Sequence, residues 1–152
     1  MHRKALELYP DSPSAAAALA DFLDAHGRPS EAEEVYRGLL KTSPNHPEGL
    51  NGLAYFLAGH GQRLDEALAL ARRALQAEPD NPDFLDTLGW TQFKRGEVEQ
   101  AEETLQKAIA AYRENPKAAE AWQHLAAVYE AKGDLPSAGD AYRQALKLQP
   151  DS

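Results

Sequence analysis

Histidines and carboxylates are the side chains of this sequence whose chemistry could support catalysis or metal binding. The histidines are His2, His26, His46, His60 and His124. None belongs to a His-Glu-x-x-His motif, and no two lie four residues apart, the spacing that puts two metal ligands on one helical face. His26 and His60 each directly precede a glycine, where an imidazole stabilises the C-terminus of a helix. A helix-stabilising role is therefore favoured over metal binding.

Other signatures of catalysis are absent from the sequence. Carboxylate pairs such as Glu33 with Glu34 lie in acid-rich segments that suit a solvated helix N-terminus. There is no Gly-x-Ser-x-Gly motif and no glycine-rich phosphate loop. The absence of cysteine excludes thiolate zinc sites and cysteine nucleophiles. We therefore expect a protein that is not an enzyme and that needs no cofactor and no metal.

Composition and charge narrow the class of partner. The chain is 43% hydrophobic and 26% charged, which is typical of a globular protein. Its net charge of −8 disfavours binding to nucleic-acid phosphates and to anionic lipid surfaces. Apolar runs such as Ser14–Ala20 are far shorter than the ~20 residues that span a bilayer. We expect no nucleic-acid partner and no direct membrane insertion, and a basic or neutral protein partner fits best.

A pattern of 34 to 37 residues recurs along the chain. Each unit has an apolar-periodic segment, a glycine, and a second apolar-periodic segment that contains an alanine at a fixed place. The glycines are Gly27, Gly61, Gly96 and Gly133, and the alanines are Ala32, Ala67, Ala101 and Ala138. Alignment on the glycines divides the chain into residues 13–46, 47–81, 82–118 and 119–152. A period of this length indicates a repeat architecture.

Each unit is predicted to be a pair of helices. One place in the first helix is always leucine: Leu19, Leu53, Leu88 and Leu125. The next residue is always small: Ala20, Ala54, Gly89 and Ala126. Small residues that face the fixed alanines of the second helix let the two helices approach closely. One pair leaves a face that it cannot cover alone, so neighbouring pairs should stack into a solenoid.

This pattern resembles the tetratricopeptide repeat family. Residues 119–152 carry its signature most fully, with Trp122, Leu125, Ala126, Tyr129, Gly133, Ala138, Tyr142, Ala145 and Pro150. The resemblance covers essentially the whole chain and implies one all-α domain over residues 1–152, a right-handed superhelical solenoid of antiparallel helix pairs. Residues 50–96 look most like bacterial repeat scaffolds, and both the bacterial cytoplasm and the periplasm are compatible with the sequence.

Several positions depart from the regular pattern. One extra residue separates Gly61 from Ala67, and Gln92 replaces a large apolar residue. The unit at residues 82–118 is three residues longer than the first, so we expect its second helix to run nearly one turn longer. Residues 4–13, "KALELYPDSP", match the end of the last unit. We therefore expect residues 1–12 to be the remnant of a preceding repeat, with a short helix near residues 3–9, in a longer solenoid.

The resemblance also implies where a partner binds. In this family the first helices line a concave groove that holds a peptide or protein segment. Carried over to this sequence, the candidate groove residues are Asp21, Asp24, Glu48, Asn51, Tyr55, Asp83, Asp86, Trp90, Lys94, Gln123, His124 and Glu130. The set is acidic and favours a segment with Lys or Arg, to which Tyr55 and Trp90 would add cation–π contacts.

Two alternatives for these residues stay open. The acidic residues could serve solubility alone, and Trp90 could simply pack against a neighbouring helix. One subclass of the family grips a C-terminal carboxylate through lysine, arginine and asparagine, but the lysine and arginine positions hold Ala17, Asp83 and Thr87 here. A carboxylate clamp is therefore not expected.

Three functions compete at this stage. The leading hypothesis is a scaffold that binds a protein segment in the acidic groove. The second is self-association through open solenoid ends, because residues 137–152 carry Ala141, Leu146 and Leu148 with no capping helix after them. The third is a non-catalytic arm of a larger envelope, secretion or enzyme complex.

Overall fold

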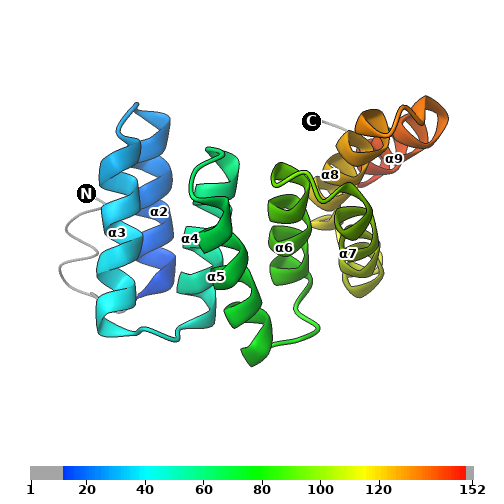
Figure 1. Ribbon diagram of the computed structural model, residues 1–152. Helices are drawn as coiled ribbons and strands as arrows, with labels where there is room; N and C mark the ends of the chain where they lie inside the picture. The colour runs from blue at the N-terminus through cyan, green and yellow to red at the C-terminus, as the bar shows by residue number, and fades with distance from the viewer. Residues whose placement is uncertain (1–11, 150–152) are drawn as a thin grey trace.

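The computed structural model describes residues 12–149 of the chain, which form helices joined by short turns (Figure 1). The helices are α2 (Pro13–Ala25), α3 (Pro29–Thr42), α4 (Pro47–Gly59), α5 (Leu64–Ala77), α6 (Pro82–Lys94), α7 (Val98–Tyr112), α8 (Ala118–Ala131) and α9 (Leu135–Leu148). We call α2, α4, α6 and α8 the first helices and the other four the second helices. Each first helix packs against the second helix that follows it.

Local sequence explains where the helices begin. Proline occupies the first position of α2, α3, α4 and α6, where its missing N–H costs nothing. Ser12, Asn81 and Asp134 cap the N-termini of α2, α6 and α9 through side-chain oxygens that accept backbone N–H bonds. These signals mark the starts of α2, α3, α4, α6 and α9, whereas α5, α7 and α8 begin without a proline or a side-chain cap.

The turn inside each hairpin depends on its glycine. Gly27, Gly61, Gly96 and Gly133 have φ values of 75°, 64°, 87° and 78°. This left-handed region is open to glycine and strained for most other residues. The prediction that these glycines end the first helices is confirmed.

The small residues let the two helices of a hairpin approach closely, as predicted. Ala20, Ala54, Gly89 and Ala126 are all buried, as are the fixed alanines of the second helices. At Gly89 a Cβ atom would lie 2.7 Å from Cγ of Leu105 in α7. This spacing leaves no room for a side chain at residue 89, so the backbone of α6 packs directly against the Leu105 side chain of α7.

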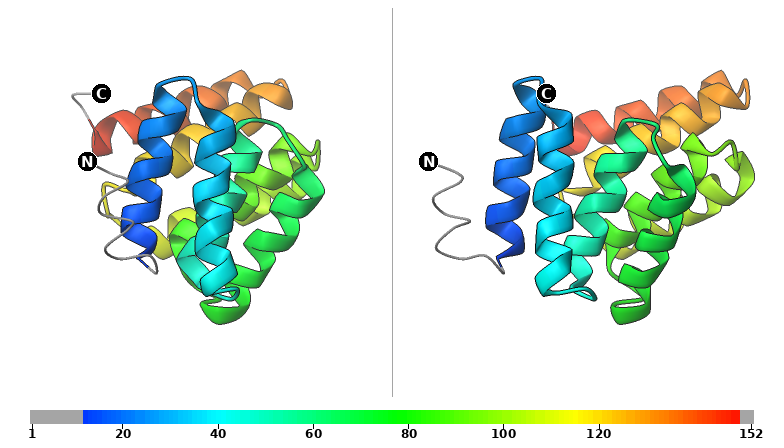
Figure 2. Two further views of the ribbon diagram at one scale, coloured as in Figure 1. Left: turned by 90° about the vertical axis from the view of Figure 1, so that its left-hand side faces the viewer. Right: turned by 60° about the vertical axis from the view of Figure 1, so that its left-hand side comes forward.

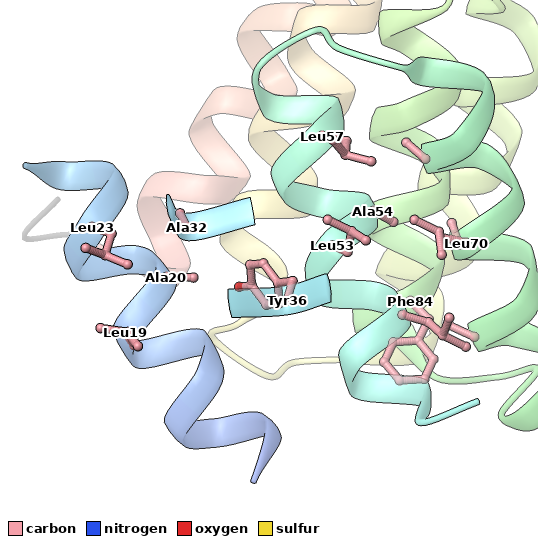
Figure 3. Close-up of a cluster of buried hydrophobic side chains, with 14 residues drawn as sticks. Leu19, Ala20, Leu23, Ala32, Tyr36, Leu53, Ala54, Leu57, Leu70 and Phe84 are labelled. Carbon is pink, nitrogen blue, oxygen red and sulfur yellow. The ribbon is translucent and has the colours of Figure 1, made fainter. Parts of the chain in front are cut away.

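The hydrophobic core runs along the array instead of gathering at one centre. A large cluster includes Leu23 of α2, Tyr36 of α3, Leu53 and Leu57 of α4, and Phe84 of α6 (Figure 3). A second cluster joins α7 to α8 through Ala101, Leu105, Leu125 and Val128. Between them, α6 buries the polar side chains of Asp86, Thr87, Thr91 and Gln92.

The hairpins follow one another in chain order, as the views in Figure 2 show. Each second helix also packs against the next first helix, and successive first helices contact one another from α2 to α8. Within residues 12–149 the fold is therefore an all-α solenoid of helix pairs, and the predicted fold class is confirmed.

The prediction of a longer second helix in the unit at residues 82–118 is wrong. Helix α7 has 15 residues against 14 in α3, α5 and α9. Residues 113–117 instead form a turn that contains Pro116. Because proline disfavours the helical conformation in the residue before it, the helix ends early and the extra residues lengthen the connection.

The extra residue after Gly61 is accommodated by the backbone of Arg63. Its φ of 44° and ψ of 52° lie in the left-handed region, directly before α5. A non-glycine residue rarely adopts this conformation, so the insertion is absorbed in a strained turn and α5 keeps its length. The predicted short helix near residues 3–9 lies outside the described residues. The division of the chain into units stays a prediction.

Candidate binding face

The surface formed by α2, α4, α6 and α8 is the candidate binding face, which we call the first-helix face. Successive first helices contact each other, so their outward side chains form one continuous surface. All twelve residues proposed from the sequence lie on these helices. Their side chains nevertheless fall into three groups: some line a pocket, some belong to a buried polar cluster, and some belong to neither.

Charge is distributed unevenly between the two sets of helices. The first helices carry seven acidic residues and one basic residue, Lys94, whereas the second helices carry nine acidic and seven basic residues. On the second helices several of the charges neutralise one another. Arg37 of α3, for example, donates to Glu33 of α3 and to Glu66 of α5, and these hydrogen bonds raise its pKa. The excess negative charge is therefore concentrated on the first helices, where one of the seven acidic residues, Asp86, is buried.

A pocket of about 300 Å³ opens between α2 and α4, and we call it the α2–α4 pocket. Its lining residues are Asp21, Asp24, Tyr36, Gly52, Tyr55, Phe56, Gly59 and His60. Three aromatic rings, two carboxylates and two glycines thus surround one opening. Asp21, Asp24 and Tyr55 were proposed from the sequence, and the structure brings them together here.

The two carboxylates of the α2–α4 pocket differ in their partners. Oδ2 of Asp24 lies 3.1 Å from Nε2 of His60, a hydrogen-bond distance. Asp21 makes no hydrogen bond or ion pair with any residue in the described part of the chain. Partial burial, and then the negative charge of Asp24, raise the pKa of the Asp21 carboxyl above its ordinary value. Asp21 therefore presents an uncompensated carboxylate at the pocket.

Tyr36 forms the deep wall of the α2–α4 pocket. Its side chain is only 6% exposed, and Figure 3 shows it between α2 and α4 with its hydroxyl on the α2 side. A Cβ atom at Gly52 would lie 2.6 Å from Cε1 of Tyr36, so the glycine makes room for the ring. Burial first, and then the charges of Asp21 and Asp24, raise the pKa of Tyr36 to about 12.

Asp86 and His124 lie in a buried polar cluster, although both were expected to face the groove. Their exposed fractions are 5% and 8%. Nδ1 of His124 in α8 lies 2.8 Å from Oδ1 of Asp86 in α6, so the pair links two first helices. A buried carboxylate needs such a partner. The pair therefore belongs to the wall beneath the face and not to its accessible surface.

Tyr55 and Asp83 extend this cluster to α4 and α7. The hydroxyl of Tyr55 in α4 donates to Oε1 of Glu120 in α8, and the Tyr55 and His124 rings lie 6.5 Å apart. The hydroxyl of Tyr112 in α7 donates to Oδ1 of Asp83 in α6. Burial and these carboxylates raise the pKa of both tyrosines. Because Tyr55 also lines the α2–α4 pocket, it joins the pocket to the buried cluster.

Trp90 packs against the same cluster. Its ring stacks on His124 with the centroids 4.1 Å apart, and Nζ of Lys94 lies 4.8 Å from the Trp90 centroid. Trp90 is partly buried. This geometry favours the packing interpretation of Trp90, and its cation–π contact already comes from Lys94 of the same helix.

The remaining proposed residues lie apart from the pocket and the cluster. Glu48 is exposed near the start of α4, and Asn51 is partly buried with its amide oxygen inaccessible to solvent. Gln123 lines a separate pocket of about 250 Å³ with Tyr142, Ala145, Leu146 and Gln149, and Glu130 accepts a hydrogen bond from Tyr142. These last two residues lie beside α9.

Sequence reasoning missed part of the α2–α4 pocket. Tyr36 lies in a second helix, four residues after Ala32, and is not among the residues proposed from the first helices. His60 was interpreted as a helix-terminal residue, an interpretation that suits His26, whose Nδ1 lies 2.8 Å from the carbonyl oxygen of Phe22. The available signal was Gly52, a glycine inside an apolar helix, because such a residue often marks a close approach of another group.

Residues 12–149 do not form a metal site. No three histidine, aspartate or glutamate side chains converge there as a metal ion would require. None of the described helices combines the length and apolar character needed to cross a membrane.

The sequence was compared with known families and proteins. Family profiles described as "Tetratricopeptide repeat" match residues 3–47, 18–82, 61–118 and 91–151. The human protein O-mannosyl-transferase TMTC1 is 30% identical over 156 residues, which cover all of this chain and 17% of that protein. The type IV pilus assembly protein PilF of Pseudomonas aeruginosa is 31% identical over 119 residues, which cover 77% of this chain and 47% of that protein. The chain thus spans less than half the length of either relative.

Solved structures agree with this family. The crystal structure of TTC0263, a thermophilic TPR protein of Thermus thermophilus, superposes with a TM-score of 0.82 at 25% identity. The superposition covers 99% of this chain and 81% of that one. Repeats of one family thus cover almost the entire sequence, and their helix pairs stack as in the solved TPR structure. The chain belongs to the tetratricopeptide repeat family.

Proposed function

We propose that the first-helix face binds a segment of a partner protein that carries lysine or arginine residues. Members of the family generally mediate protein–protein interactions and act as scaffolds. The observation that supports the basic partner is the separation of charge: seven acidic residues against one basic residue on the first helices. A surface of one sign attracts a segment of the opposite sign and orients it on approach.

The same proposal holds that this chain does not catalyse a reaction. The polar side chains that come together, Asp86, His124, Glu120 and Tyr55, are bonded to one another. Catalytic groups need access to a substrate, and Asp86 and His124 are buried. The similarity to a transferase covers only 17% of that protein, so it does not carry the transfer reaction to this chain.

Selection from a random peptide library displayed on phage tests the proposal. The immobilised protein should enrich peptides with more lysine and arginine than the starting library contains. A selected peptide should then bind less tightly to the variant Glu48→Lys/Asp83→Lys, by about tenfold, because two carboxylates of the face are reversed. Fluorescence anisotropy of the labelled peptide measures the affinity.

The matched control reverses two exposed carboxylates of second helices, Glu34→Lys/Glu103→Lys. It changes the net charge by the same amount, so a general charge effect would lower the peptide affinity of both variants equally. Binding by the control should stay within about threefold of the original protein, because exposed charges far from the peptide are screened. Equal losses in the two variants, or selected peptides without basic enrichment, would contradict the proposal.

A second candidate function is self-association through α9. Tyr142 and Leu146 of this helix are 42% and 53% exposed, and both line the 250 Å³ pocket beside Gln123. Contiguous exposed apolar patches mark protein contacts, and these two side chains lie next to each other on one helical face. If a second copy of the chain binds there, light scattering should show a mass that rises with concentration and falls back in Leu146→Glu. A constant monomer mass would rule this candidate out.

The setting of the chain and the number of its units are also proposals. A scaffold role in a bacterial envelope or secretion complex is compatible with the similarity to a pilus assembly protein. We further propose that residues 13–46, 47–81, 82–118 and 119–152 are successive repeats, since α2, α4 and α6 begin at Pro13, Pro47 and Pro82.

A further inference from the structure

We propose that the α2–α4 pocket is an anchor site for a single cationic side chain, lysine or arginine, of the bound segment, with Asp21 as its ion-pair partner. This inference rests on the proposed function and specifies which part of the face selects the partner. Four observations on the pocket carry it: its size, its free carboxylate, its unpaired hydroxyl and its aromatic walls.

The size of the pocket suits one side chain. Its volume of about 300 Å³ lies at the lower limit of pockets that hold small ligands, roughly 300 to 1,000 Å³. The room exists because residue 52 is glycine: with a Cβ atom there, the ring of Tyr36 would have to move. A segment lying across α2 and α4 can therefore insert one long side chain while its backbone stays on the surface.

The charge of the pocket selects a cation. Asp24 already lies at hydrogen-bond distance from His60, but Asp21 has no cationic partner among residues 12–149. Lys94 is the only basic residue of the described first helices, and it lies over Trp90 in α6. An incoming ammonium or guanidinium group would form a charge-assisted hydrogen bond with Asp21, a bond stronger than one between neutral groups. It would also relieve the repulsion between Asp21 and Asp24.

The hydroxyl of Tyr36 is a second hydrogen-bonding group at the pocket. The side chain is more than nine-tenths buried and lines the pocket, yet its hydroxyl makes no hydrogen bond within the described part of the chain. The hydroxyl oxygen is not among the buried side-chain atoms that lack a partner in the described residues, so it is accessible at the pocket. An N–H group of a bound cation could donate to this oxygen, while the neighbouring carboxylate accepts another.

The aromatic walls add a preference for a long basic side chain over a bare inorganic cation. Tyr55 and Phe56 line the pocket together with Tyr36, and the Tyr36 and Phe56 centroids lie 6.3 Å apart. Rings in this arrangement pack against the methylene groups of lysine or arginine, and their faces attract the charged end. A carboxylate beside aromatic rings thus matches both parts of such a side chain.

Titration with small mimics tests the anchor site directly. The probes are the acetylated and amidated forms of arginine, lysine and citrulline, of which citrulline is the uncharged counterpart of arginine. In ¹H–¹⁵N NMR spectra, the arginine or lysine probe should cause saturable shifts at the amides of Gly52, Tyr55 and Gly59. Citrulline should cause none there at the same concentration. The two charged probes also show which basic residue the pocket prefers.

Three variants separate the pocket from general electrostatics. Asp21→Asn should weaken probe binding about tenfold, because it removes the ion pair and keeps the shape. Tyr36→Phe should weaken it about threefold, because only the hydroxyl is lost. Gly52→Ala should reduce it strongly by forcing the Tyr36 ring into the pocket. Glu34→Gln, which removes one exposed carboxylate of α3, is the control and should leave binding unchanged.

The outcomes are distinguishable from those for the proposed function. Saturable shifts confined to the pocket and lost in Asp21→Asn support the anchor site. Shifts spread evenly along the first helices, or equal shifts with citrulline, overturn it. If library peptides are basic and bind the face while neither charged probe affects the pocket, the anchor site is wrong and the proposed function stands.

Discussion

At the scale of single residues, the buried pair Asp86 and His124 shows how neighbouring units are held together by polar contacts. Burial raises the pKa of the Asp86 carboxyl above its ordinary value of 3.8. The hydrogen bond and charge of His124 oppose this effect, and the charges of Glu120 and Asp83 add to it. The folded protein therefore favours the protonated form of Asp86 more than the unfolded chain does. Its contribution to stability is complete below pH 3.8 and is lost as the pH rises through the folded-state pKa.

The variant Asp86→Asn tests whether the contribution of Asp86 to stability falls as the pH rises. Asparagine does not titrate and keeps an oxygen that accepts the hydrogen bond from Nδ1 of His124. Relative to the original protein, the variant should gain stability as the pH rises from about 4 to about 7, because only the original protein must then bury a carboxylate. Urea unfolding followed by circular dichroism at several pH values measures the difference. If the variant instead loses stability relative to the original protein as the pH rises, the attraction between Asp86 and His124 outweighs the cost of burying the carboxylate.

At the scale of helices, two close approaches between packed helices occur at residues without side chains. Gly89 brings α6 against Leu105 of α7, and Gly52 brings α4 against Tyr36 of α3. Glycine lowers helix propensity, so its presence inside α4 and α6 has a cost that close packing offsets. Gly38 of α3 differs, because a Cβ atom there would meet nothing within 4 Å.

Alanine substitutions at two glycines should therefore have opposite effects. Gly38→Ala should stabilise the protein by about 0.5 to 1 kcal/mol, because it raises helix propensity at an open position. Gly89→Ala should destabilise it by about 1 to 3 kcal/mol, because Leu105 is fully buried and cannot move aside. Free energies of unfolding from urea titrations provide the comparison. Stabilisation by both substitutions would mean that α6 and α7 can separate at little cost.

At the scale of the whole molecule, the core is divided along the solenoid. The cluster around Leu53 joins α2 to α6, and the cluster around Leu125 joins α7 to α8. Helix α6 lies between them and buries Asp86, Thr87, Thr91 and Gln92. The helix packing joins neighbouring hairpins, with the Tyr55–Glu120 hydrogen bond from α4 to α8 as an exception, so stability should be largely a sum of local terms.

Amide hydrogen exchange can measure whether the two core clusters stabilise separate parts of the solenoid. Leu23→Ala should speed amide exchange mainly in α2 and α3, and Leu125→Ala mainly in α8 and α9, since each creates a cavity in one cluster. The two leucines are only 1% and 2% exposed, and a buried leucine truncated to alanine costs about 2 to 5 kcal/mol. Mass spectrometry of peptic fragments resolves the two regions. Uniform acceleration over residues 12–149 would instead indicate a single cooperative unit.

The sequence by itself determined the repeat, the turn glycines, the small residues between helices and the acidic character of the first helices. These features follow from local periodicity and from residue size, which are visible along the chain. Only the tertiary structure decided which of the proposed residues are accessible. Asp86 and His124 are buried against each other, Trp90 packs on His124, and Tyr36 enters the pocket from a second helix. Side chains from helices that are distant in sequence determine the shape of the face, and none within residues 12–149 gives Asp21 a cationic partner. Periodicity carries no information about such contacts.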